Sequence, residues 1–201
     1  MDSISALPRA DPPPRRRPHR LRRWLWRVFS RLRGRGPTRL LDPSGLVAAG
    51  QRLMRGGRHG AALVVFDFED LTELGELYGD RARREAVRQV AQALHRIGGT
   101  DGVAARTGAT QFSLLVPGCS AEQAVARAVR ELGMPCRLEL DLDGGEAVLL
   151  PDLLAEACPP GASGLGALHR QMDERLAEQR QQRQQREQYL RRSRERYSHS
   201  R

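Results

Sequence analysis

Residues 106–118 read Arg-Thr-Gly-Ala-Thr-Gln-Phe-Ser-Leu-Leu-Val-Pro-Gly, and this stretch decides the fold. A basic residue precedes a turn of small residues, and Phe112 then opens the apolar run 114–116. A small-residue bend followed by a continuous apolar run is typical of a β-hairpin whose outgoing strand is buried. We therefore predict strands at 103–106 and 111–116, joined by a turn that faces solvent.

The neighbouring segments predict a mixed α/β domain around this hairpin. Residues 61–66 are continuously apolar and run into the acidic sequence Asp-Phe-Glu-Asp, the profile of a central strand with acids at its C-terminal end. Apolar periodicity predicts a helix at 81–97, and the capping box Ser-Ala-Glu-Gln predicts another at 121–132. The other predicted elements are a short helix after 42–46, a half-exposed strand at 136–142, a return strand at 147–150, a short helix at 152–158 and a last helix from Leu165.

The last predicted helix changes character along its length. Leu168, Met172 and Leu176 share one face, but residues 179–186 contain only Gln and Arg. A helix that is polar all round buries nothing by itself. The tail 173–201 is therefore expected to be an extended helix, a partner-dependent coil or disordered.

Charge divides the chain into three parts. Residues 1–41 hold 12 Arg and 2 acids (net +10), residues 42–172 have a net charge of −4, and residues 173–201 have a net charge of +4. The high isoelectric point therefore belongs to two basic arms around a mildly acidic domain. The absence of Lys and Asn indicates a GC-rich bacterial genome.

The N-terminal arm contains a predicted amphipathic helix. Residues 1–18 are rich in Pro and Arg and should be flexible or extended. The helix that follows is about 20 Å long, too short to span a bilayer but suited to its interface. Its apolar face consists of Leu21, Trp24, Leu25, Val28, Phe29 and Leu32. This face could bind anionic lipid or pack on the domain or a partner, and the Arg residues could bind nucleic acid, although no base-reading motif accompanies them.

Cysteine and histidine patterns predict no metal site. The three cysteines are odd in number and lack C-x-x-C spacing, so neither a disulfide framework nor a zinc site is expected, and a reducing compartment fits best. Nothing near the N-terminus has the apolar core of a signal peptide, so we expect a cytoplasmic protein. The histidines are scattered and expected at the surface; they are His19, His59, His95, His169 and His199.

The order of these segments resembles the GGDEF domain of diguanylate cyclases. The resemblance rests on Asp-Pro-Ser-Gly-Leu at 42–46, the strand ending in Asp-Phe-Glu, Leu-Tyr-Gly-Asp at 77–80, and the hairpin stretch. It covers roughly 42–135 well and 136–176 loosely. It implies an α/β (α+β) fold similar to the adenylyl cyclase core, in which helices flank an antiparallel-centred sheet.

The resemblance also implies what the site has lost. In the family, the Gly-Gly-Asp-Glu-Phe turn and an acid ending the first strand bind two Mg²⁺ ions that hold GTP. Asp67 matches the strand acid, and Glu69 is the other acid left that could hold a metal or nucleotide. Thr110 replaces the signature acid, Gln111 replaces the signature Glu, and Ala109 replaces a Gly. The whole signature turn here is Gly108, Ala109, Thr110, Gln111 and Phe112.

The nucleotide-binding positions differ as well. Gly75 and Arg84 fall where the family has its guanine-binding Asn and Asp, and Thr72 takes the place of a Lys. Arg84 offers only hydrogen-bond donors, whereas guanine N1–H needs an acceptor. The family's product-binding Arg-x-x-Asp motif fails too, because its positions are Gly99 and Gly102.

These losses predict a protein that is not an enzyme and needs no cofactor, since two Mg²⁺ ions require more than one hard anionic ligand. We expect a regulatory or scaffolding protein at the inner membrane surface. Its expected partners are proteins, through the domain and the C-terminal helix, an anionic membrane through the N-terminal helix, and further copies of itself, rather than nucleic acid. The alternatives are a receptor for cyclic di-GMP or GTP with Mg²⁺, and a nucleic-acid-binding protein. Asp67, Glu69 and Asp70 could also form only a solvated strand end, and the domain could be an unrelated antiparallel α/β fold.

Overall fold

The computed structural model describes residues 39–56, 60–140, 145–158 and 164–198. The predicted arm and amphipathic helix at 1–38 lie outside the described residues. Within the described part of the chain, no helix is both long and apolar enough to cross a membrane.

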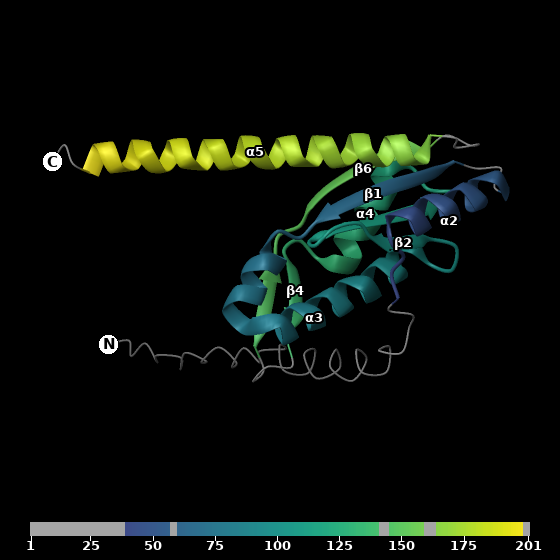
Figure 1. The fold of residues 1–201 in the computed structure, drawn as a ribbon, viewed down its shortest axis with the longest axis horizontal. Coiled ribbons are helices and arrows are strands. Elements are labelled where there is room, and N and C mark those ends of the chain that lie inside the picture. Colours follow the sequence, from purple (N-terminus) through teal and green to yellow (C-terminus); the bar gives the residue numbers. More distant parts are fainter. Residues whose placement is uncertain (1–38, 57–59, 141–144, 159–163, 199–201) are drawn as a thin grey trace, which may run out of the picture. The chain divides into compact units, whose positions relative to one another are not determined.

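An antiparallel sheet forms the centre of the domain (Figure 1). Its strand order is β2 (Val103–Arg106), β3 (Gln111–Pro117), β1 (Ala61–Asp67) and β6 (Asp152–Cys158). β1 lies between β3 and β6, and every one of its residues is buried, as its continuous apolar run requires. The predicted hairpin and the antiparallel-centred sheet are confirmed.

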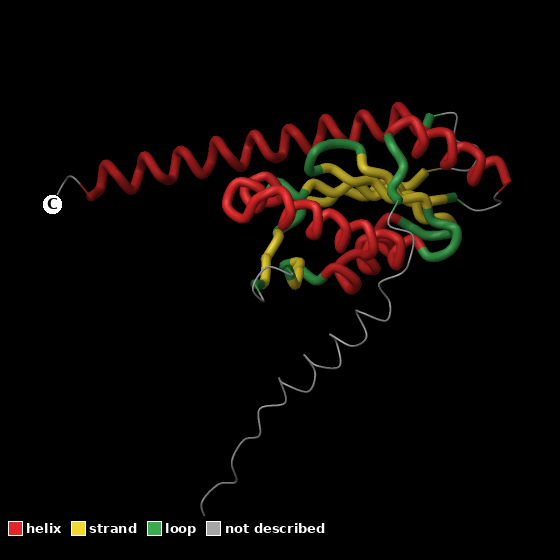
Figure 2. Tube along the Cα trace, turned by 60° about the horizontal axis from the view of Figure 1, so that its bottom comes forward, coloured by secondary structure: helices red, strands yellow, loops and turns green. Residues whose placement is uncertain are grey.

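Helices cover both faces of the sheet (Figure 2). α3 (Asp70–Gly98) and α4 (Ala121–Leu132) pack on the face that carries Val64 and Phe66 of β1. α2 (Pro43–Gly56) and α5 (Leu165–Ser198) pack on the opposite face, against Leu63 and Val65. Since side chains alternate along a strand, Asp67 belongs to the face under α5.

The structure corrects the sequence prediction for two of these elements. Residues 152–158 form β6 and not a helix, because all seven residues pair with β1, whose second edge would otherwise have open backbone groups. The apolar spacing in α4 also favours an inward Val129 beside Ala124, Ala128 and Leu132, but Val129 is 40% exposed and only the other three form the buried face of that helix.

One helix is longer than predicted, and the remaining predicted strands and the capping box are present. α3 begins at Asp70, and the predicted helix at 81–97 is its second part, after a break at Gly79, whose φ of 79° favours glycine. β4 (Cys136–Glu139) and β5 (Glu146–Leu149) form a separate two-stranded antiparallel sheet, as the predicted strand at 136–142 and its return strand at 147–150 require. The predicted capping box at Ser120 and Gln123 is present at the start of α4.

α5 docks on the sheet through its first turns. Leu165, Met172 and Leu176 are buried against α2 and the sheet, and the helix continues without interruption past residue 173. Within the same stretch, Arg175 forms an ion pair with Glu156 of β6. The contact with α2 is close because Gly50 lacks a side chain: a Cβ there would lie 2.4 Å from Leu165 Cδ2.

This close approach predicts opposite effects for two helical glycines. Gly50→Ala should destabilise the protein, because overpacking a core costs about 1–3 kcal/mol and exceeds the roughly 1 kcal/mol that Ala gains over Gly in a helix. Gly166→Ala is the matched control, since its Cβ would meet Val47 at an ordinary 3.7 Å. Chemical denaturation should rank Gly166→Ala at or above the wild type and Gly50→Ala below it; the reverse order would contradict this packing.

Candidate functional site

The candidate site is centred on Asp67, the last residue of β1. Its neighbours across the sheet are Gln111 on β3 and Asp152 on β6. Asp67 is only 1% exposed. A charged carboxylate at such a position requires a partner, because burying an unpaired charge is very unfavourable.

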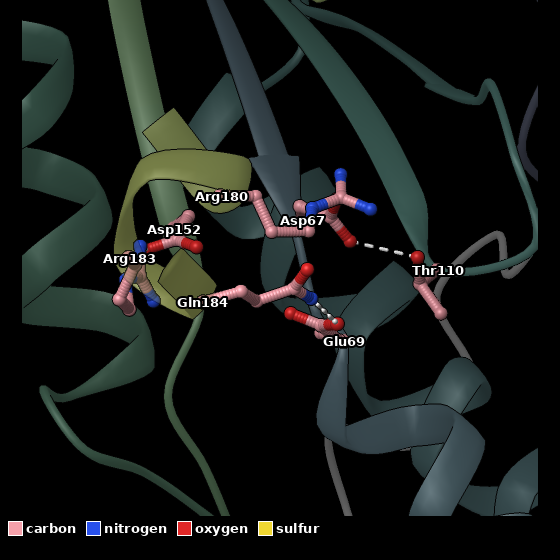
Figure 3. Close-up of polar contacts among 7 residues, drawn as sticks. All are labelled: Asp67, Glu69, Thr110, Asp152, Arg180, Arg183 and Gln184. Carbon is pink, nitrogen blue, oxygen red and sulfur yellow. Dashed lines mark hydrogen bonds and ion pairs between the residues drawn. The ribbon is translucent and has the colours of Figure 1, made fainter. Parts of the chain in front are cut away.

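Both carboxylate oxygens of Asp67 have partners from this chain (Figure 3). Thr110 Oγ1 donates a hydrogen bond of 2.7 Å to Oδ1. Arg180 Nη2, from α5, donates to Oδ2 and forms an ion pair with it. The strand end is therefore not simply solvated at Asp67, which corrects one of the alternatives drawn from the sequence.

The next residues of α5 contact the two neighbouring acids (Figure 3). Arg183 Nη2 donates to Asp152 Oδ1 at 2.5 Å, and Gln184 Nε2 donates to Glu69 Oε1 at 3.3 Å. Sequence analysis missed these residues because their stretch contains only Gln and Arg. The signal was their spacing, since Arg180 and Gln184 follow Leu176 at intervals of four and so stay near the docked face of the helix.

The signature turn is closed by its own hydrogen bonds. Gly108 N donates to the carbonyl of Gln111 at 3.2 Å. Arg106 donates from Nε to Gly108 O at 3.1 Å and from Nη2 to Ala109 O at 2.7 Å. Its guanidinium also lies 5.9 Å from the centre of the buried Phe112 ring. The turn thus has a fixed shape, and Ala109 is the one residue of the signature turn that is exposed.

Positive charge gathers beside this turn. Burial lowers the pKa of the Arg106 guanidinium, and the nearby charge of Arg83 lowers it further. The Arg83 side chain also fills the space beside Gly75, where an added Cβ would lie 3.1 Å from Arg83 Cδ. Arg84, the residue singled out by the sequence, is instead exposed.

The arrangement does not fit the two Mg²⁺ ions that the resemblance implies. Each ion needs several hard oxygen ligands, preferably anionic. Asp67 already binds a hydroxyl and a guanidinium, and Thr110 provides no negative charge. Among the residues that the structure describes, no group of three or more His, Cys, Asp or Glu side chains could hold a metal ion.

A second polar cluster joins α5 to β3. Ser113 Oγ lies 2.8 Å from His169 Nε2, and His169 Nδ1 lies 2.9 Å from Asp173 Oδ2. His169 is buried, so its predicted surface position was wrong. The order Ser, His, Asp is that of a hydrolase triad, but Ser113 is fully buried and offers no approach to a substrate. The cluster is therefore a structural contact between helix and sheet.

The described surface also has an open depression at the other end of the strands. Small residues and two thiols line it: Gly60, Ala61, Gly118, Cys119, Ser120, Ala157 and Cys158. Burial raises the pKa of the Cys158 thiol to about 11, so this group is uncharged and unreactive at neutral pH. No charged side chain lines the depression, and it lies away from Asp67.

Comparisons with known proteins agree with the architecture. The family model described as "Diguanylate cyclase, GGDEF domain" matches residues 44–186. The GGDEF domain of TpbB (YfiN) from Pseudomonas aeruginosa is similar, with a TM-score of 0.62 and 18% identity over 72% of this chain and 87% of that one. The GGDEF domain of DgcB from Caulobacter crescentus, solved in complex with c-di-GMP, is similar with a TM-score of 0.58 and 18% identity, over 71% and 86% of the two chains.

A third similar structure contains a protein partner. The diguanylate cyclase SiaD from Pseudomonas aeruginosa, solved in complex with its activator SiaC, has a TM-score of 0.55 and 15% identity over 81% of this chain and 65% of that one. No curated protein sequence matches the chain. At these identities the likeness to solved structures supports the fold.

The Ser113–His169 contact predicts a coupled loss of stability. Ser113→Ala should cost about 1–3 kcal/mol, because the buried His169 nitrogen is left without its partner. His169→Leu should cost a similar amount. The double variant should lose less than the sum of the two, since the same interaction is removed only once.

A double-mutant cycle by urea denaturation measures this coupling. Ser44→Ala, which removes an exposed hydroxyl bonded to Asp42, is the control and should change stability little. Strictly additive losses at positions 113 and 169 would show that the contact stabilises nothing.

Proposed function

Because the chain belongs to the GGDEF domain family, we propose that it is a catalytically inactive member that regulates or scaffolds other proteins. The observation that carries this proposal is that the Asp67 carboxylate already has two partners within the chain. Both oxygens of the carboxylate that the resemblance assigns to metal binding are engaged by Thr110 and Arg180 of the same chain. A cyclase would need that carboxylate free to neutralise Mg²⁺.

The signature turn supports the proposal independently. Phosphoryl chemistry of this kind is promoted by metal ions and positioned charges that neutralise the triphosphate. Thr110 and Gln111 are neutral and supply neither a metal-binding nor a catalytic carboxylate. The hydrogen bonds of Arg106 keep the bend of the turn without its acids.

The guanine-binding positions also lack their chemistry. The space beside Gly75, where the family has an Asn, is filled by Arg83 of this chain. Arg84 can only donate hydrogen bonds, so it cannot accept from guanine N1–H. A guanine base would have to displace the Arg83 guanidinium, and Arg84 would offer it no hydrogen-bond acceptor.

We propose that the domain instead binds a protein partner. SiaD, which has a similar fold, was solved in complex with a protein activator, and this is a precedent for a protein partner of a protein with this fold. In this chain, residues 185, 186 and 188–190 of α5 are all exposed, and Tyr189 is among the most exposed apolar side chains described. Exposed aromatic residues beside Arg are typical of protein-binding surfaces. We further propose that residues 1–41 hold the protein at the cytoplasmic face of the inner membrane.

The second candidate is a receptor that binds an anionic nucleotide without converting it. The proximity of Arg83 and Arg106 beside the turn favours this candidate, because a bound phosphate would relieve the repulsion between the two guanidinium groups. The DgcB domain solved with c-di-GMP makes that nucleotide a suitable probe.

Nucleotide titration distinguishes the two candidates. Calorimetry with GTP and with c-di-GMP, with and without Mg²⁺, should show no micromolar binding if the protein is a scaffold. Arg83→Gln is the matched variant, because binding that this change weakens would support the receptor instead. Incubation with GTP and Mg²⁺ should yield no product. Product that forms with the wild type and disappears in Asp67→Asn would show that the protein is an active enzyme.

The membrane proposal has its own test. The full chain should co-sediment with vesicles containing anionic lipid and dissociate in high salt, because Arg residues and an apolar face would share the binding. Trp24→Glu with Phe29→Glu should abolish co-sedimentation, whereas Val148→Glu on exposed β5 should not. If the wild-type chain stays in the supernatant, the proposed membrane binding is wrong.

A further inference from the structure

We infer that Arg180 is a built-in counter-ion for Asp67, and that it makes the part of α5 beyond Leu176 an ionic latch over the end of β1. The ionic latch consists of Arg180, Arg183 and Gln184, which contact Asp67, Asp152 and Glu69 respectively. The inference goes beyond the proposed function, because it requires neither a nucleotide nor a partner.

The way α5 is anchored changes at Leu176. Up to that residue the docked face consists mainly of apolar side chains, with Leu165, Met172 and Leu176 buried. From Arg180 to Gln184 the helix contacts the strand end through hydrogen bonds and ion pairs. The helix therefore has an apolar anchor followed by a charged one, and the ionic latch requires that the charged one can open while the apolar one stays in place.

The sheet end creates the need for a cation. Asp67 and Asp152 are directly opposite each other on β1 and β6, so their side chains lie on the same face. Two carboxylates in that arrangement destabilise a sheet. Arg180 and Arg183 each pair with one of them.

Burial makes the three contacts unequal. The Asp67 side chain is 1% exposed and the Arg180 side chain 27%, so water screens this pair poorly. For Arg183 and Asp152 the values are 48% and 24%, and surface pairs of that kind contribute little. The Gln184 bond to Glu69 is long and exposed. Arg180 should therefore determine whether the latch is closed.

Opening the latch would change what the domain offers to solvent. With α5 released only beyond Leu176, Asp67 and Asp152 would lose their guanidinium partners and become accessible from the α5 side. The rest of the fold would stay in place, because the apolar anchor and the Ser113–His169 contact lie nearer the helix start. Access to the strand-end carboxylates is thus controlled by the chain itself.

Hydrogen exchange of the full-length protein, read by mass spectrometry, tests the latch. In Arg180→Gln, amides between 178 and 186 should exchange at least about tenfold faster than in the wild type, because local opening sets their protection. Amides at 168–176 should be unchanged. Arg186→Gln, an exposed residue on the same helix, is the matched control and should behave like the wild type.

A charge-removal rescue completes the test. Asp67→Asn together with Arg180→Gln leaves two neutral amides, so the double variant should melt at a higher temperature than Arg180→Gln alone, in which a buried carboxylate lacks its partner. This comparison remains informative if Arg180→Gln alone folds poorly. Unchanged exchange at 178–186 in Arg180→Gln, equal acceleration along all of α5, or a double variant no more stable than the single one would each overturn the latch.

Discussion

The buried carboxylate of Asp67 is the constraint to which the rest of this structure responds. A charge at the end of a fully buried strand must be neutralised or hydrogen-bonded. The chain provides a hydroxyl from the neighbouring hairpin and a guanidinium from its last helix. One acid thereby links β1, the signature turn and α5, which are far apart in the sequence.

Both partners of Asp67 depend on ordinary packing. The hairpin holds Thr110 beside the end of β1 because β3 pairs with β1 over all seven residues. α5 carries Arg180 to the same point because Leu176, one turn earlier, and Met172, two turns earlier, hold the helix to the sheet. The apolar core therefore positions both partners of Asp67.

Local patterns predicted much of this fold. The hairpin, the buried strand β1 and the capped helix α4 each carry their signal within a few adjacent residues, and the structure contains all three. β6 was mistaken for a helix, because its sequence favours neither state strongly and pairing with β1 decides the outcome. Asp67 was recognised as the central acid, but its partner Arg180 lies 113 residues away, and only the folded chain brings the two together.

The pairing of Arg175 with Glu156 and of Arg183 with Asp152 has a consequence for solubility. β6 is the last strand of its sheet, and an open strand edge is a template on which another chain can add. Four charged side chains along that edge, two of them supplied by a packed helix, make such an addition unfavourable. We therefore expect the helix that covers Asp67 also to protect the sheet against aggregation.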